Sequence, residues 1–413
     1  MVLVNTKIYS TINGIYYTSV NAVFGFVAFY LLSKGVSNSI IGTLISVTSV
    51  INFFLQPILG NAIDRSRKIQ HHHIICILAA LTFVSGLSIL FLANEKWCLL
   101  LFLAFAMIMT QLNMPIINTL SSIWTNRGHH VNFGIARGIG SVCYALASFV
   151  IGYLSDVKHF GSTFIPVSIC ATTGLLLVTM IILSPSLSKI SKDTNNENLS
   201  QLECSVGLWG FMSKYWKFML FILGSVFVYV GHNIITNFTI NIVAPLGGGS
   251  NEVGIISGIA AACELPTMFL FSKINKKISV STLIVSGGMF FTIKILFCLI
   301  AFSCRNMEML FAVQTLQMLG FALFIPASVI FTNFVISNED ITIGQAFVTA
   351  SNSAGGIIGS LLGGSLLDVI SVKNMLLCTV VISAIGTFII IASVFLMKSG
   401  NALSHGTSLL PSQ

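Results

Sequence analysis

Val253-Gly-Ile-Ile-Ser-Gly-Ile-Ala-Ala-Ala-Cys-Glu-Leu-Pro-Thr-Met-Phe-Leu-Phe-Ser272 is an apolar stretch with one acidic residue, Glu264, near its middle. The stretch is about as long as the ~20 residues that an α-helix needs to cross a bilayer. An ionised carboxylate at this depth is unfavourable unless it is paired or protonated, so we interpret Glu264 as a substrate or proton site. The alternative is a buried polar group that joins two helices.

The composition of the whole chain is that of an integral membrane protein. Of 413 residues, 55% are hydrophobic and 8% are charged, whereas soluble domains contain about 25% charged residues. Dividing the apolar runs at charged or Gly/Pro/Asn-rich breaks predicts an all-α membrane protein with twelve transmembrane helices. The predicted spans are 9–33, 39–63, 73–93, 98–123, 134–155, 163–185, 218–245, 253–272, 280–303, 309–334, 345–367 and 375–397.

The positions of Lys and Arg predict the orientation. An even number of spans puts both termini on one side, and the loops on that side hold thirteen basic residues: Lys7, Arg65, Arg67, Lys68, Arg127, Lys189, Lys192, Lys214, Lys217, Lys273, Lys276, Lys277 and Lys398. The opposite loops hold five: Lys34, Lys96, Lys158, Arg305 and Lys373. Cytoplasmic loops carry the excess of basic residues, so we expect a multi-pass cell-membrane protein with both termini in the cytoplasm. The net charge of +8 follows from this asymmetry and does not indicate nucleic-acid binding.

The spans divide into two halves. We predict an N-terminal six-helix bundle at 1–185, a cytoplasmic linker at 186–217, a C-terminal six-helix bundle at 218–398 and a cytoplasmic tail at 399–413. The linker is the only long polar stretch and is too poor in apolar residues to pack. A basic loop follows the second span of each half, which is typical of carriers built from two pseudo-symmetric bundles.

Other function classes lack sequence support. The chain has no Walker loop and no catalytic constellation, so we expect neither an enzyme nor a cofactor. The nine cysteines are scattered singly, without a CxxC pair, and are interpreted as packing residues. The adjacent His71, His72 and His73 cannot all face one ion on a helix, so we expect no metal site.

The first stretch that resembles a known family lies at the end of the second predicted span. Between Asn52 and Lys68 the chain is similar to the loop signature of the major facilitator superfamily, a glycine, an acid and several basic residues: Gly60, Asp64, Arg65, Arg67 and Lys68. The resemblance implies the fold of that superfamily and a gate loop on the cytoplasmic side. Glycine permits close helix approach, and the carboxylate can bond a neighbouring helix.

Two further stretches resemble the oligosaccharide symporter branch, which includes lactose permease, and the sugar-efflux carriers. Residues Asn132 to Leu146 are similar to the segment with the family's sugar-binding arginine and ring-stacking aromatic, which implies these roles for Arg137 and Tyr144. Seven residues are two helical turns, so both side chains share one face. Arg137 alone could also be an interfacial arginine that extends its head group to the membrane surface.

The second stretch carries the acid of the opening paragraph. The resemblance between His232 and Glu264 places Glu264 on the family's sugar-binding glutamate, and Thr267 could add a hydroxyl one turn further. A carboxylate accepts hydrogen bonds from two sugar hydroxyls, and Arg137 across the cavity would keep it ionised.

The chain also departs from the branch, because most of its charged partners are replaced by neutral polar residues. At family charge positions stand Asn118, His232, Ile235, Gln314, Gln317, Gly320 and Asn352. Lys294 matches a family arginine and is the expected charge partner. We expect Asn118, His232, Gln314, Gln317 and Asn352 to bind substrate. The alternative, which extends to Asn233 and Asn237, is hydrogen bonding between helices.

The resemblance implies a secondary active transporter for a sugar or oligosaccharide, coupled to protons. Only Glu264 and His232 remain as titratable groups near the midplane, so we assign proton coupling to Glu264, with His232 as the rival. The expected partners are a small-molecule substrate, the proton and the lipid bilayer, and we expect a monomer. The alternatives are a transporter of a small organic anion, favoured by two intramembrane cations against one acid, and a sugar exporter or facilitator without proton coupling.

Overall fold

The computed structural model describes residues 2–65, 70–92, 95–126, 131–192, 208–337 and 339–404. Within these residues every regular element is a helix. Eleven helical segments are long and apolar enough to cross a membrane. The helix α15 (Ile341–Val369), with 29 residues, is the twelfth long helix and coincides with the predicted span 345–367. It holds many glycines and serines and is not among the eleven segments.

The first group of helices builds six spans. The first span is interrupted by a π-helical segment, and a short 3₁₀ turn precedes the sixth. The elements are α1 (Val2–Val20), η1 (Asn21–Gly25), α2 (Val27–Ser33), α3 (Asn38–Arg65), α4 (His71–Leu92), α5 (Lys96–Asn126), α6 (Phe133–Leu154), η2 (Gly161–Thr163) and α7 (Phe164–Lys192).

The second group of helices builds the other six spans. The tenth span of the chain, which belongs to this group, is broken in the middle. The elements are α8 (Leu208–Lys214), α9 (Trp216–Asn237), α10 (Thr239–Val243), η3 (Ala244–Leu246), α11 (Ser250–Lys277), α12 (Val280–Ser303), α13 (Met307–Val313), η4 (Gln314–Met318), α14 (Phe321–Val335), α15 and α16 (Val372–Ser404).

The predicted linker and tail are more helical than the sequence suggests. The helix α7 continues to Lys192, and α8 occupies most of 208–217. Phe211 of α8 is fully buried, with its ring stacked 5.5 Å from that of Phe347. One apolar anchor is therefore enough to order this part of a polar stretch. The helix α16 runs to Ser404, past the predicted start of the tail.

An ion pair fastens α8 to the second group. The Nζ atom of Lys214 donates to Oδ2 of Asp340 at 2.8 Å, and the Asp340 side chain is fully buried. The hydrogen bond to Asp340 raises the pKa of Lys214 above its ordinary value. The Tyr215 hydroxyl donates to the same carboxylate oxygen at 3.1 Å. The end of the linker is thus held against the start of α15.

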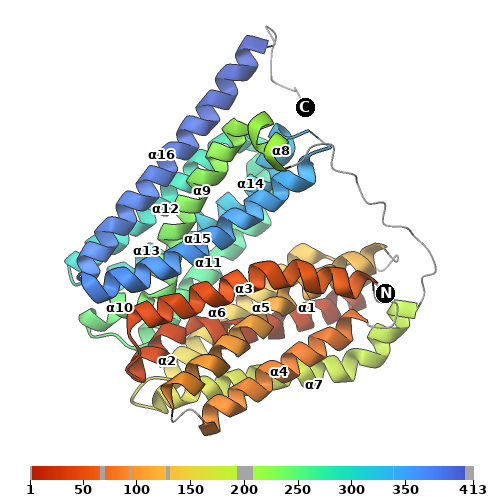
Figure 1. The fold of residues 1–413 in the computed structure, drawn as a ribbon, viewed down its shortest axis with the longest axis vertical. Coiled ribbons are helices and arrows are strands. Elements are labelled where there is room, and N and C mark those ends of the chain that lie inside the picture. The colour runs from red at the N-terminus through yellow and green to blue at the C-terminus, as the bar shows by residue number, and fades with distance from the viewer. Residues whose placement is uncertain are drawn as a thin grey trace.

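The two groups meet at one end and diverge toward the other, where the chain termini lie (Figure 1). The extensive contacts between them are made by α3 with α15 and by α6 with α11. The closest backbone approaches of both pairs lie near the end opposite the termini, because they involve the first turns of α3 and α11 and the later turns of α15 and α6. We call this end the closed side.

Glycines bring the backbones together on the closed side. A Cβ at Gly364 of α15 would collide with the backbone oxygen of Asn38, and one at Gly254 of α11 would collide with that of Ser148. Without a glycine, each helix pair would have to separate, as is general for tight helix crossings in membranes. The Ser250 hydroxyl adds a hydrogen bond of 3.0 Å to the Gly152 carbonyl across the second pair.

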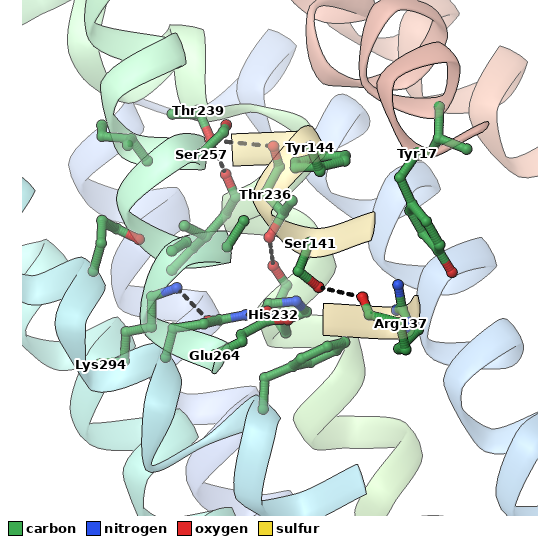
Figure 2. A pocket seen from close by; sticks show the side chains of 18 residues that line it. Tyr17, Arg137, Ser141, Tyr144, His232, Thr236, Thr239, Ser257, Glu264 and Lys294 are labelled. Atoms are coloured by element: carbon green, nitrogen blue, oxygen red, sulfur yellow. Dashed lines mark hydrogen bonds between the residues drawn. The ribbon is translucent and has the colours of Figure 1, made fainter. Parts of the chain in front are cut away.

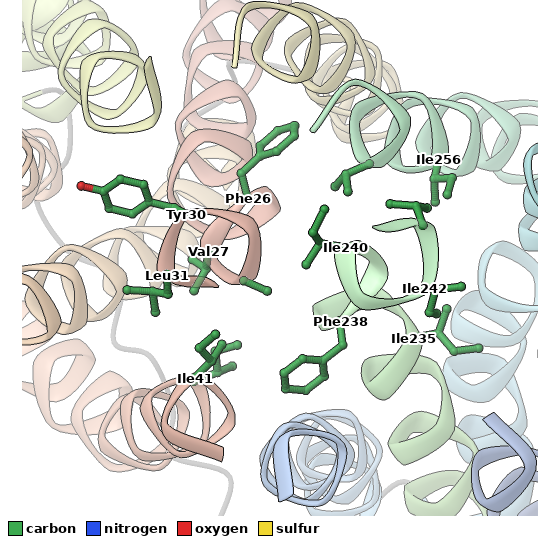
Figure 3. Packing of buried hydrophobic residues seen from close by; sticks show 14 of the residues in the cluster. Phe26, Val27, Tyr30, Leu31, Ile41, Ile235, Phe238, Ile240, Ile242 and Ile256 are labelled. Carbon is green, nitrogen blue, oxygen red and sulfur yellow. The ribbon is translucent and has the colours of Figure 1, made fainter. Parts of the chain in front are cut away.

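Both groups contribute to one apolar cluster on the closed side (Figure 3). Phe26 and Val27 come from the end of the first span, and Phe238 and Ile240 come from the end of the seventh. Two further clusters lie separately within the first and the second group. The shared cluster therefore joins two halves that otherwise have cores of their own.

A carboxylate of the second group caps a helix of the first. The Oδ1 atom of Asp368 accepts hydrogen bonds from the backbone N and the Nδ2 of Asn38, both at 3.1 Å. Its Oδ2 accepts one from the backbone N of Ser39 at 2.8 Å. Negative charge at a helix N-terminus is stabilising, because the first N–H groups have no partner inside the helix. Asp156 holds the equivalent position at the end of α6, but its Oδ1 accepts from Lys158 N in its own turn, at 2.9 Å.

We therefore expect Asp368→Asn to weaken the association of the two helix groups on the closed side. Asp156→Asn should leave that association nearly unchanged. The amide removes the negative charge from the helix N-terminus, a loss of about 0.3–1 kcal/mol for an exposed carboxylate. The measurement is the distance distribution between spin labels at Lys34 and Lys373, by double electron–electron resonance in a cysteine-free background. The Asp368 variant should show a larger long-distance population, and an equal shift in both variants would contradict the capping role.

Candidate functional site

A cavity of about 240 Å³ lies between the two groups of helices. Figure 2 shows side chains entering it from both sides. The first group contributes residues of α1 and α6, and the second contributes residues of α9, α10, α11, α12, η4 and α14. The lining includes seven of the residues predicted from sequence: Arg137, Tyr144, His232, Glu264, Lys294, Gln314 and Gln317.

Glu264 and Lys294 are connected through an amide. The Lys294 Nζ donates to Oε1 of Gln317 at 2.7 Å, and the Gln317 Nε2 donates to Oε1 of Glu264 at 3.0 Å. The carbonyl end of the amide dipole faces the cation, and its NH₂ end faces the carboxylate. Charge-assisted hydrogen bonds of this kind compensate both buried charges without direct contact between them. Lys294 is only 6% exposed, whereas Glu264 is partly open to the cavity.

A break in the tenth span presents Gln317 and Gln314. The sequence predicts one continuous helix over 309–334, but the segment η4 is 3₁₀-helical and Gly320 has φ −86° and ψ −93°, outside the helical range. A 3₁₀ stretch inside a helix places side chains at i and i+3 on the same side, which suits Gln314 and Gln317. Interrupted helices line the binding sites of many transporters.

Arg137 and Tyr144 stand on the wall formed by the first group. The Cζ atom of Arg137 lies 4.2 Å from the ring centroid of Tyr17, a cation–π contact. Tyr17 was not singled out by sequence reasoning, although it is one of two adjacent tyrosines in the first span. Tyr144 lines the same wall seven residues after Arg137, as the helical spacing predicts.

His232 forms part of an aromatic surface. Its ring lies 4.9 Å from that of Phe321 with the planes 25° apart, and 5.4 Å from that of Phe291 in an edge-on arrangement. Phe321 also lines the cavity. Stacking of this kind holds the imidazole in a fixed orientation and gives the cavity a flat apolar face beside its polar groups.

Several hydroxyls in the lining were missed by the sequence reasoning. They are those of Ser141, Thr236, Thr239 and Ser257. Serine and threonine are common in membrane helices, where the hydroxyl often bonds the carbonyl four residues earlier. Thr236 does so with His232 at 2.9 Å, and Thr239 does so with Ile235 at 2.9 Å. Sequence alone therefore does not distinguish these hydroxyls from the others.

Three residues expected in the substrate site lie elsewhere. Asn118 lines a separate hollow with Ser121, Ser122 and Thr125 of α5. Thr267 is 3% exposed and is absent from the cavity wall, because its side chain turns into the protein one turn after Glu264. Asn352 is exposed on α15. The structure thus does not bring these three together with Glu264.

Two other amides hydrogen-bond within or between helices. The Nδ2 atom of Asn237 on α9 donates to the Ser360 hydroxyl of α15 at 2.8 Å. The Nδ2 atom of Asn233 donates to the backbone oxygen of Tyr229 at 2.9 Å, within α9. For Asn237 the geometry favours the helix-joining alternative that the sequence left open.

The predicted gate loop is described only in part. Gly60 lies in α3, and a Cβ at this position would meet no atom of a described residue within 4 Å, so the described residues show no close helix approach there. The backbones of Asp64 and Arg65 end α3, but their side chains lie outside the described residues, as do Arg67 and Lys68 entirely.

Comparison with known proteins identifies relatives along the whole chain. The MFS_1 like family matches residues 8–378. The uncharacterized transporter YwbF of Bacillus subtilis (strain 168) is 20% identical over 398 residues, covering 95% of this chain and 94% of that protein. A maltose permease of Geobacillus stearothermophilus is 25% identical over 163 residues, which are 39% of this chain and 40% of the permease.

Solved transporter structures have the same fold. The nucleoside transporter NupG gives a TM-score of 0.77 at 13% identity, covering 94% of this chain and 98% of that one. A bacterial homologue of the iron transporter ferroportin in an inward-facing state gives a TM-score of 0.72 at 14% identity, covering 95% of this chain and 99% of that one. With the family match extending over most of the chain, the protein belongs to the MFS_1 like family and is a multi-pass membrane transporter of the major facilitator superfamily, not an enzyme.

Proposed function

We propose that this transporter moves a small hydroxyl-rich solute, a sugar or oligosaccharide, across the cytoplasmic membrane by alternating access, with proton coupling through Glu264. The supporting observation is the cavity between the two groups of helices, where a partly open carboxylate lies opposite an arginine and a tyrosine. A carboxylate accepts, and an arginine donates, the hydrogen bonds that sugar hydroxyls require. A flat aromatic surface suits the apolar face of a sugar ring.

The size of the cavity favours a small member of this class. Its volume of about 240 Å³ is below the roughly 300–1,000 Å³ of clefts that hold drug-sized ligands. A monosaccharide therefore fits the proposal better than a long oligosaccharide. A maltose permease among the relatives and a nucleoside transporter among the similar structures both carry names of solutes with hydroxylated rings, which supports the same class.

The orientation follows from the excess of basic residues. With both termini in the cytoplasm, the closed side faces outward and the diverging ends of the helices face the cytoplasm, so this structure would be an inward-facing state. A direct test of the function is counterflow of radiolabelled monosaccharides in proteoliposomes. No exchange of any hydroxylated solute would contradict the proposal, whereas exchange without a response to pH would identify a facilitator or exporter.

Glu264→Gln should keep some solute exchange but lose accumulation driven by a pH gradient. The amide has the same shape and can accept a hydrogen bond from a hydroxyl, but it cannot take up a proton. Replacing a charged acceptor by a neutral one should weaken binding roughly 10- to 100-fold, as expected for about 1.5–3 kcal/mol. Counterflow and pH-jump uptake in proteoliposomes measure the two properties separately.

The control for this experiment is His232→Gln, which removes the other titratable group of the cavity. We expect it to reduce pH-driven accumulation less than Glu264→Gln does, because the imidazole is held between Phe321 and Phe291. If accumulation persists in Glu264→Gln and fails in His232→Gln, proton coupling belongs to the histidine.

Substitutions of Tyr144 test whether a ring stacks on the solute. Tyr144→Phe keeps the ring and should bind the solute almost as well as the wild type. Tyr144→Ala removes the aromatic surface and should weaken binding roughly 2- to 10-fold beyond the loss of buried area. Isothermal titration calorimetry compares the two, and equal losses would mean that the hydroxyl, not the ring, is the part that matters.

A further inference from the structure

The charges around the cavity do not balance. Arg137 and Lys294 are cations, Glu264 is the one carboxylate among the lining residues, and His232 is neutral in the formal count. The lining therefore carries one net positive charge when Glu264 is ionised. Within the membrane a single unbalanced charge is unfavourable, because water is too sparse to solvate it.

The carboxylate is already engaged on the side of Lys294. The chain from Lys294 Nζ through the amide of Gln317 to Glu264 Oε1, with distances of 2.7 Å and 3.0 Å, joins these two opposite charges. All three residues belong to the second group of helices. Lys294 is also almost fully buried, so it does not offer its charge to a solute.

Arg137 is the cavity cation without a direct polar partner. In the part of the chain that the structure describes, no carboxylate lies within ion-pair distance of its guanidinium, and the one such pair found is that of Lys214 with Asp340. The guanidinium also donates no hydrogen bond to a described residue. Tyr17 covers one face of it at 4.2 Å, and Arg137 lines the cavity (Figure 2).

The guanidinium of Arg137 is planar and carries five N–H donors, which suits an anion that presents two oxygens. Carboxylate and phosphate groups accept two parallel hydrogen bonds from one guanidinium, and this is the strongest polar contact that the arginine could make. A neutral sugar hydroxyl would satisfy some of the donors but would leave the charge uncompensated.

We propose that the solute is a hydroxylated ring that carries one negative charge, with its anionic group on the Arg137 guanidinium and its hydroxyls toward Glu264. This inference rests on the proposed function and specifies its substrate class. The loaded cavity is then electrically neutral, and the solute contacts both groups of helices at once. The cavity volume of about 240 Å³ suits one ring with a carboxylate or a phosphate.

Ligands that differ in one group test the proposal on the purified wild-type protein in nanodiscs. Glucose, glucuronate, glucose 6-phosphate and glucosamine share a ring but carry no charge, a carboxylate, a phosphate and a cation. We expect glucuronate or glucose 6-phosphate to bind at least about tenfold more tightly than glucose, and glucosamine to bind most weakly. Which of the two anions binds more tightly distinguishes a carboxylate site from a phosphate site.

Variants assign the preference to one side chain. Arg137→Gln should weaken the binding of every ligand, because fewer donors remain for hydroxyls, but it should weaken anion binding more, so the ratio of anion to glucose affinity falls to about one. Arg137→Lys should keep part of that ratio, because it retains the charge but not the fork. The matched control is Arg305→Gln, the same substitution at an exposed arginine outside the cavity, and it should keep the full ratio. Melting temperatures of all variants establish that they are folded.

The outcomes separate this inference from the proposed function. If glucose binds as tightly as the anions, or if the preference survives in Arg137→Gln, the charge assignment is wrong although the hydroxylated solute stands. Benzoate binding as tightly as glucuronate would overturn the hydroxylated ring in both proposals. If no ring compound of either charge binds, the proposed function itself fails, and this inference fails with it.

Discussion

The compensation of buried charge by Gln317 is the interaction on which the cavity depends. Lys294 and Glu264 both stand in helices that cross the membrane, where neither would be stable as a lone ion. One amide satisfies both, because its two ends have opposite polarity and lie 2.7 Å and 3.0 Å from their partners. An amide between them therefore takes the place of a direct ion pair without leaving these two ions isolated.

That compensation takes place at an irregular stretch of helix. In a continuous α-helix, Gln314 and Gln317 would follow the regular spacing of the tenth span, but η4 tightens at this point and Gly320 leaves the helical conformation. Such a break exposes backbone groups that lipid could not satisfy, so it is tolerated only inside protein or beside a polar cavity. The break and the cavity consequently occur together, and the position of one indicates the position of the other.

Sequence predicted most of the fold and part of the site. Long apolar runs determine helix positions strongly, so the twelve spans agree with the helices to within a few residues at most ends. Glu264 was singled out because an acid inside a membrane span needs a reason, and Arg137 and Tyr144 were singled out by resemblance; all three line the cavity. The roles of Tyr17 and Ser257 depend on which helix faces which, and this is decided by glycine contacts such as that of Gly364 with Asn38. Asn352 and Asn118 lie away from this cavity, and an amide in a helix has no sequence signal for the face that it occupies.

The division of the contacts between the two groups bears on how such a carrier alternates. The chain from Lys294 to Glu264 lies wholly within the second group, so a movement between the groups leaves it intact. The bonds from Asn38 and Ser39 to Asp368 join the two groups, but Asp368 is exposed, so water can replace these partners when the closed side opens. Arg137 belongs to the first group and Glu264 to the second. A solute that contacts both would hold the groups together from inside the cavity, whereas an empty cavity has no such connection between Arg137 and the carboxylate. The bonds of Asp368 that join the two groups are thus placed where water is available, and the connected charges of Lys294 and Glu264 are kept within one group.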